Sequence, residues 1–124
     1  MDTFSAFDRQ SPYQVWKGVV ARAIQGDRIT LALVDLEPGA VVSEHQHENE
    51  QLGFVVLGEM RMTIGGTPRD LNPGDTYVIP GNVPHIAVAG PQGCTVVDVF
   101  SPPRADWEKL DRLEPTPGRW PRGS

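Results

Sequence analysis

Three histidines carry the clearest chemical signal in this chain of 124 residues. His45 and His47 are two positions apart, so on a β-strand both side chains point to one face, where two imidazoles can bind one metal ion. Gln51 lies at an even offset and shares that face, whereas Glu50 has the opposite parity unless the strand bends. His85 starts another predicted strand, after a turn rich in proline and glycine. Spacing alone leaves two interpretations open: a metal site, or a surface pair and an unrelated packed ring.

A second candidate group lies near the end of the last apolar run. Asp98 stands among valines and shares its strand face with Phe100. A carboxylate inside a barrel is costly unless it is paired, and Arg104 is the nearby candidate partner. The arginine could equally bind a carboxylate of a ligand. The alternative is an outward-facing Asp98 and a rim Arg104 that form a weak surface pair.

The elements that must position these residues are short strands. Apolar runs alternate with glycine- and proline-containing turns about every ten residues, which predicts a sandwich or barrel of antiparallel strands. The expected strands cover residues 15–24, 28–36, 41–47, 52–64, 69–71, 76–79, 85–89 and 94–100. Apolar residues that recur every three positions predict a short helix over 105–113. This organisation leaves an N-terminal arm (1–13), a barrel (14–104) and an extended C-terminal tail (114–124).

Composition excludes several classes of protein. The formal net charge of −5 argues against a nucleic-acid partner, and no apolar run is long enough to span a membrane. The lone Cys94 excludes an internal disulfide and a multi-cysteine metal site, and we expect an inert buried thiol. The first residues lack the basic and apolar regions of a signal peptide, so a cytoplasmic location is expected.

The histidines, glycines and prolines together resemble the two sequence motifs of the cupin superfamily. Positions that match the first motif are Gly39, His45, His47 and Gly58, and Gln51 stands at its acidic position. Positions that match the second motif are Gly74, Pro80 and His85. Asn82 and Ala89 depart from the second motif. The resemblance covers about residues 28–104. It implies an all-β, cupin-type antiparallel barrel, jelly-roll-like with two packed sheets, followed by the one short C-terminal helix.

The resemblance also implies one divalent metal ion, bound by His45, His47, Gln51 and His85. Zn, Ni, Mn, Co and Fe are all compatible with these ligands. Because a glutamine stands where the motif has an acid, the ion would keep its full charge of +2. Such a site favours anionic, oxygen-rich ligands and redox-neutral chemistry.

A run of the type D-x-F-x-P-x-R resembles the pectin-degradation cupins, which linearise unsaturated uronates. The resemblance implies that Asp98, Phe100 and Arg104 line the pocket beside the metal. Asp98 would then transfer a proton, Arg104 would bind the uronate carboxylate, and Phe100 would supply an apolar wall. Tyr77 and Met60 are further candidates for contact with the substrate, with packing in the core as the alternative.

Two alternative functions remain open at this point. One is a metal-dependent cyclase or oxygenase of secondary metabolism, since single-domain cupins include such enzymes. The other is a non-catalytic, metal-dependent binding protein. In each case the expected partner is a small molecule, and the resemblance also implies a homodimer.

Overall fold

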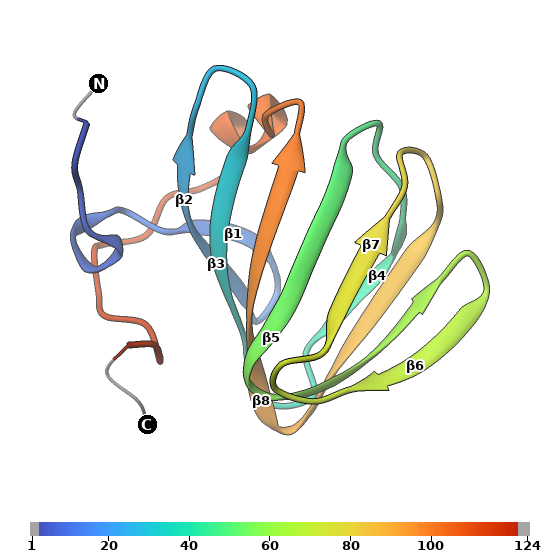
Figure 1. The fold of residues 1–124 in the computed structure, drawn as a ribbon. Helices are drawn as coiled ribbons and strands as arrows, with labels where there is room; N and C mark the ends of the chain where they lie inside the picture. Colours follow the sequence, from blue (N-terminus) through green and yellow to red (C-terminus); the bar gives the residue numbers. More distant parts are fainter. Residues whose placement is uncertain (1–2, 122–124) are drawn as a thin grey trace.

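An antiparallel sheet of eight strands, curved back on itself, forms the body of the molecule (Figure 1). The computed structural model describes residues 3–121. In chain order the elements are η1 (Phe7–Arg9), β1 (Tyr13–Trp16), β2 (Val19–Gln25), β3 (Thr30–Leu36), β4 (Val41–His45), β5 (Glu50–Ile64), β6 (Thr67–Leu71), β7 (Thr76–Ile79), β8 (His85–Ser101) and η2 (Ala105–Lys109). Both η elements are short 3₁₀ helices, so the predicted all-β fold is confirmed.

The two longest strands, β5 and β8, bend and take part in both layers of the barrel. The hydrogen-bonded order is β1-β2-β3-β8-β5-β6, with β4 on β8 and β7 on β5. The first half of β5 pairs with β7 and the last part of β8, and its second half pairs with β6 and the first part of β8. Gly58 lies at the bend with a φ of +74°, and a Cβ there would overlap the Gly93 carbonyl oxygen. Glycine is therefore required where the sheet turns.

Alternate strand residues point into the barrel and form the core. Ala32 and Val34 of β3, Ile79 of β7 and Val96 of β8 are all buried there. Cys94 is fully buried, and this burial raises the pKa of its thiol to about 12. The expectation of a buried cysteine is thus confirmed, and the high pKa makes the reactive thiolate scarce.

Several strand boundaries differ from the prediction. The strand expected over 41–47 ends at His45, so His47 lies in the following loop. The run 15–24 is two strands, because the chain turns at Gly18, which has a left-handed φ of +76°. The runs 85–89 and 94–100 are one strand, β8, because the chain stays extended through residues 90–93 and bends there without leaving the sheet. The last two differences concern only where the chain is continuous, whereas the first removes His47 from the predicted strand.

The C-terminal helix is shorter than the predicted 105–113. It is the 3₁₀ helix η2, which ends at Lys109. Further along, the Leu113 N–H donates to the Pro12 carbonyl (2.8 Å), and Arg112 forms an isolated bridge with Tyr13. Because these backbone groups bond next to β1, the chain after η2 is extended and the apolar periodicity does not continue as a helix.

The N-terminal and C-terminal segments lie on the same side of the barrel (Figure 1). Arg22, buried on β2, donates to the carbonyl and the hydroxyl of Thr116 (3.1 Å each) and pairs with Asp35 (3.1 Å). The described part of the tail is therefore fixed to the sheet by a buried guanidinium. No helix within residues 3–121 is long and apolar enough to cross a membrane.

Candidate active site

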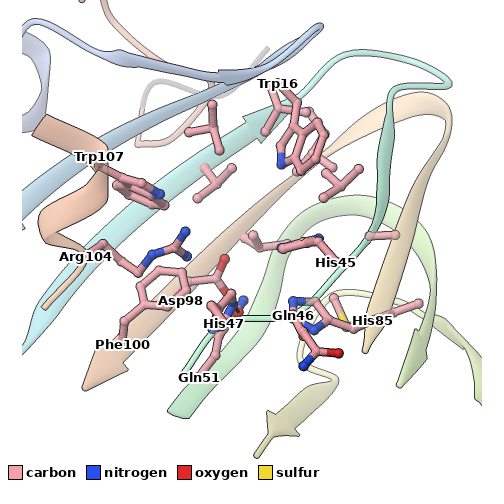
Figure 2. Close-up of a pocket in the computed structure, with 18 of the residues that line it drawn as sticks. Trp16, His45, Gln46, His47, Gln51, His85, Asp98, Phe100, Arg104 and Trp107 are labelled. Carbon is pink, nitrogen blue, oxygen red and sulfur yellow. Dashed lines mark hydrogen bonds between the residues drawn. The ribbon is translucent and has the colours of Figure 1, made fainter. Parts of the chain in front are cut away.

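The three histidines converge at one end of the barrel. His45 ends β4, His85 begins β8, and the pairing of these two strands sets the two residues opposite each other. His47 lies in the loop between β4 and β5. One ring nitrogen of each histidine lies within 4.8 Å of the others, and Figure 2 shows the rings gathered on one wall of a pocket. The cluster is compact enough to bind a single metal ion.

Each histidine ring is oriented by a backbone carbonyl two residues away. The Nδ1 atoms of His45, His47 and His85 lie 2.9, 3.0 and 2.9 Å from the carbonyl oxygens of Ser43, Asn49 and Val83. A carbonyl oxygen only accepts hydrogen bonds, so each Nδ1 carries the proton and each Nε2 keeps its lone pair. This tautomer is the one that ligates a metal through Nε2, with the carbonyl as the supporting outer partner.

Burial keeps His47 and His85 neutral. It lowers the pKa of His85 to about 4, and it also lowers the pKa of His47, with the Arg104 charge acting in the same direction. A neutral imidazole is the form that binds a metal, so at neutral pH these two rings need not lose a proton first. They therefore fit a divalent cation in protonation state as well as in position.

Gln51, on β5, faces the same cluster. Its Oε1 atom lies 3.2 Å from Nε2 of His47, and the side chain is buried, whereas Glu50 is exposed. With the proton on Nδ1 of His47, two hydrogen-bond acceptors face each other here, an arrangement that a cation between them would satisfy. The structure thus brings Gln51, and not Glu50, to the histidines, although a loop over residues 46–49 separates β4 from β5 and the strand repeat does not run through it.

Asp98 is buried and points inward from β8, so the outward-facing alternative is wrong. Its carboxylate accepts a hydrogen bond from the Tyr77 hydroxyl at 2.6 Å. Burial raises the pKa of Asp98 to about 6, although hydrogen bonds from Tyr77 and Gln51 and the charge of Arg104 each act to lower it. The bond from Gln51 must come from its amide nitrogen, which turns Oε1 toward the histidines.

Arg104 is paired with Asp106 and not with Asp98, which corrects the partner expected from sequence. Its Nε and Nη2 atoms donate to the two Asp106 carboxylate oxygens at 3.1 and 3.0 Å. The guanidinium carbon lies 4.8 Å from the ring centroid of Phe100 and 4.9 Å from that of Trp107. This fork-like pairing and the two rings hold the guanidinium at the pocket wall, near Asp98 in Figure 2.

These groups surround a cavity of about 340 Å³. All the predicted site residues line it: His45, His47, Gln51, His85, Asp98, Phe100, Arg104, Tyr77 and Met60. Apolar side chains complete the lining, among them Val19 of β2 and Val34 and Leu36 of β3. The cavity therefore combines donors and a metal site with apolar packing surface.

Sequence reasoning missed several residues of this site. Trp16 and Trp107 line the pocket, although only packing or interface roles are suggested by their positions in the chain. Trp16 lies with its ring centroid 5.4 Å from that of His45. Asn49 is buried; its carbonyl orients His47, and its side chain donates to the Pro102 carbonyl near Arg104. No sequence signal marks the contact of Trp16 with His45 or of Asn49 with Pro102, because each joins segments far apart in the chain.

Gly53 is a further missed residue. It pairs with Tyr77 on β7 and with Asp98 on β8, and a Cβ there would overlap the Tyr77 ring and the Asp98 carboxylate. The hydrogen bond between these two side chains therefore depends on the absence of a side chain at residue 53. An isolated glycine inside an apolar strand is the signal that could have revealed this close approach.

Comparisons with known proteins agree with this geometry. The model of the cupin domain family matches residues 32–100. The chain is 30% identical over 103 residues to the pectin degradation protein KdgF of Dickeya dadantii, covering 81% of this chain and 94% of that protein. Among solved structures, KdgF from Halomonas sp. superposes with a TM-score of 0.77 at 32% identity, covering 86% of this chain and 98% of the other. An RmlC-like cupin from Shewanella frigidimarina gives a TM-score of 0.80 at 27% identity, with coverages of 86% and 96%.

Proposed function

This chain belongs to the cupin family and is a homologue of the pectin degradation protein KdgF, and from this premise we propose that it is a metal-dependent enzyme that opens the ring of an unsaturated uronate. One observation carries the proposal: three imidazoles with free Nε2 atoms share a pocket with a buried carboxylate and a fixed guanidinium. Such a pocket combines a cation site, a proton carrier and an anion-binding group.

Four neutral donors would hold the metal ion: the imidazoles of His45, His47 and His85 and the amide oxygen of Gln51. Zn, Ni, Mn, Co and Fe all suit such ligands. When bound, the ion supplies Lewis-acid polarisation of a sugar oxygen. Since no protein carboxylate among these donors offsets its charge, an anionic substrate is favoured.

Opening a hemiacetal ring moves protons without net change. The proton of a sugar hydroxyl leaves, the bond from the ring oxygen to the same carbon breaks, and a proton returns to the product. All three histidines direct Nε2 toward the metal site, so none is left for this task. Asp98 can take and return the proton, because its raised pKa of about 6 lies near neutrality and its side chain lines the pocket.

The proposal is tested with unsaturated galacturonate, whose absorbance falls as its conjugated group is lost. Protein reloaded separately with each candidate metal should accelerate this loss, and chelator-treated protein should not. Oxygen uptake with Fe(II) bound should be absent, which separates ring opening from an oxygenase reaction. A protein that binds metal but fails to accelerate the loss at any metal loading would refute the uronate assignment.

The metal ligands give a direct prediction. His85→Ala should weaken metal binding by more than about 100-fold, beyond the usual cost of losing an outer-shell partner, because it removes a coordinating nitrogen. Glu50→Gln should leave binding unchanged, since Glu50 is exposed. Metal titration by calorimetry and elemental analysis of the purified proteins measure both effects. Equal affinity in His85→Ala and the wild type would contradict the proposed ligand set.

Arg104 should determine substrate affinity. We expect Arg104→Ala to raise KM by about 10- to 100-fold, because a charge-assisted hydrogen-bond pair to the carboxylate is lost. Arg61→Ala is the matched control, since Arg61 pairs with Asp70 on the exposed outer surface. Steady-state kinetics on metal-loaded protein provide the measurement. An unchanged KM for Arg104→Ala, or an equal rise for the control, would show that Arg104 does not bind the substrate.

A further inference from the structure

The indole N–H of Trp107 is a buried donor without an acceptor. Trp107 lies on η2 and is 3% exposed, yet no acceptor within residues 3–121 is in hydrogen-bonding distance of its Nε1 atom. A buried donor left without a partner is costly, so such groups in native proteins call for a specific explanation. The residue lines the pocket, and in Figure 2 its nitrogen is on the side of the ring that faces the cavity.

The surroundings of Trp107 define what could accept this hydrogen bond. Its ring packs against Phe100 (centroids 5.3 Å apart) and Tyr13 (5.7 Å), and the Arg104 guanidinium lies 4.9 Å from the ring centroid. The indole N–H and the guanidinium both donate only. A ligand at this wall must therefore present acceptor oxygens. Asp106 accepts from Nε and Nη2 of Arg104, which leaves Nη1 to donate to such a ligand.

We propose that Trp107 and Arg104 together form a two-donor subsite for the substrate carboxylate, with the indole N–H as the specific donor. This inference rests on the proposed function and names a residue that sets substrate specificity. The Phe100 and Tyr13 rings fix the indole, so the donor is held in position before the substrate arrives. A neutral sugar presents only hydroxyl and ring oxygens, which accept weaker hydrogen bonds than the two charged oxygens of a carboxylate.

The test measures binding without turnover. Calorimetry on metal-loaded protein compares galacturonate, the saturated acid, with galactose, its neutral counterpart. Trp107→Phe keeps an apolar ring but removes the N–H, and it should weaken galacturonate binding by about tenfold while leaving galactose binding unchanged. In denaturant unfolding, the midpoint concentration of Trp107→Phe should fall only by the amount expected for replacing an indole with a smaller phenyl ring. Trp16→Phe, at the same pocket, should leave the preference for the acid unchanged.

Each outcome of this experiment decides the inference. Equal galacturonate affinity in Trp107→Phe and the wild type would overturn it, and so would an equal loss for both sugars, which would indicate packing. Absence of galacturonate binding by the wild type would overturn it as well. A Trp107-dependent preference for the acid, in a protein that does not consume unsaturated galacturonate, would support the subsite and refute the proposed function.

Discussion

Asp98→Asn should slow ring opening by about 10²- to 10⁴-fold while leaving the metal content unchanged. The variant keeps the shape of the side chain and can still accept the Tyr77 hydrogen bond, but an amide cannot carry the transferred proton. All three histidines have their Nδ1 atoms bonded to backbone carbonyls, so none of them can replace the carboxylate. The rate loss should therefore appear in kcat more than in KM.

Single-turnover kinetics on metal-loaded protein measure this effect. Asp70→Asn is the matched control, because the Asp70 side chain is 76% exposed and paired with Arg61 on the outer surface. It should retain the wild-type rate. If Asp98→Asn also retained that rate with metal bound, proton transfer by Asp98 would be ruled out.

The same substitution should stabilise the metal-free protein above pH 6. Burial raises the pKa of Asp98 from its ordinary value of 3.8 to about 6. Below pH 4 the carboxyl group is protonated in both folded and unfolded chains. Between pH 4 and 6 the unfolded chain releases this proton first, so the free energy of unfolding falls as the pH rises. At pH 8 the asparagine variant should be more stable by on the order of 3 kcal/mol.

Denaturant unfolding of chelator-treated protein at pH 4, 6 and 8 measures this difference. Subtracting the wild-type curve from that of the variant removes the contribution of other titrating groups. A difference that does not change between pH 4 and pH 8 would show that the carboxyl group titrates normally in the folded state.

Gly53→Ala should destabilise the protein by about 2–4 kcal/mol and remove most of its activity. The added methyl group would overlap the Tyr77 ring and the Asp98 carboxylate. Both neighbours are buried on paired strands, so neither can move away without disturbing the sheet. The substitution therefore affects the core and the proposed proton carrier together.

Gly39→Ala separates this overlap from the general cost of replacing a glycine. Gly39 has a left-handed φ of +70°, and a Cβ there would meet nothing within 4 Å. Its substitution should cost about 1–2 kcal/mol through the backbone alone and leave the rate unchanged. Denaturant unfolding and kinetics compare the two variants. Equal effects in both would show that the space beside Asp98 tolerates a methyl group.

Strand periodicity predicted part of the site. Asp98 and Phe100 lie on one strand, β8, and the two-residue repeat correctly put both side chains in the pocket. Parity also predicted that His45, His47 and Gln51 share one face, and the three do meet, but for another reason. The chain leaves the strand after His45, so a loop positions His47 and a separate strand, β5, positions Gln51.

Partners from distant strands could not be predicted in this way. Sequence proximity suggested Arg104 as the partner of Asp98, whereas the structure provides Tyr77, which lies 21 residues away on another strand. The helix expected over 105–113 ended early for a similar reason, since its later backbone groups bond next to β1. Both errors come from judging a residue by its neighbours in the chain when the sheet supplies other neighbours.

The alternation of the strands limits where the chain can change in length. Gln51 and Leu52 are adjacent on β5, and the first lines the pocket while the second is exposed on the opposite side of the strand. A one-residue insertion or deletion within the strand would exchange these two environments for every residue beyond it. Such changes should be confined to the turns between strands, for example residues 65–66 or 72–75. Homologues of this protein should therefore differ in loop length while the spacing of residues inside β5, β7 and β8 stays fixed.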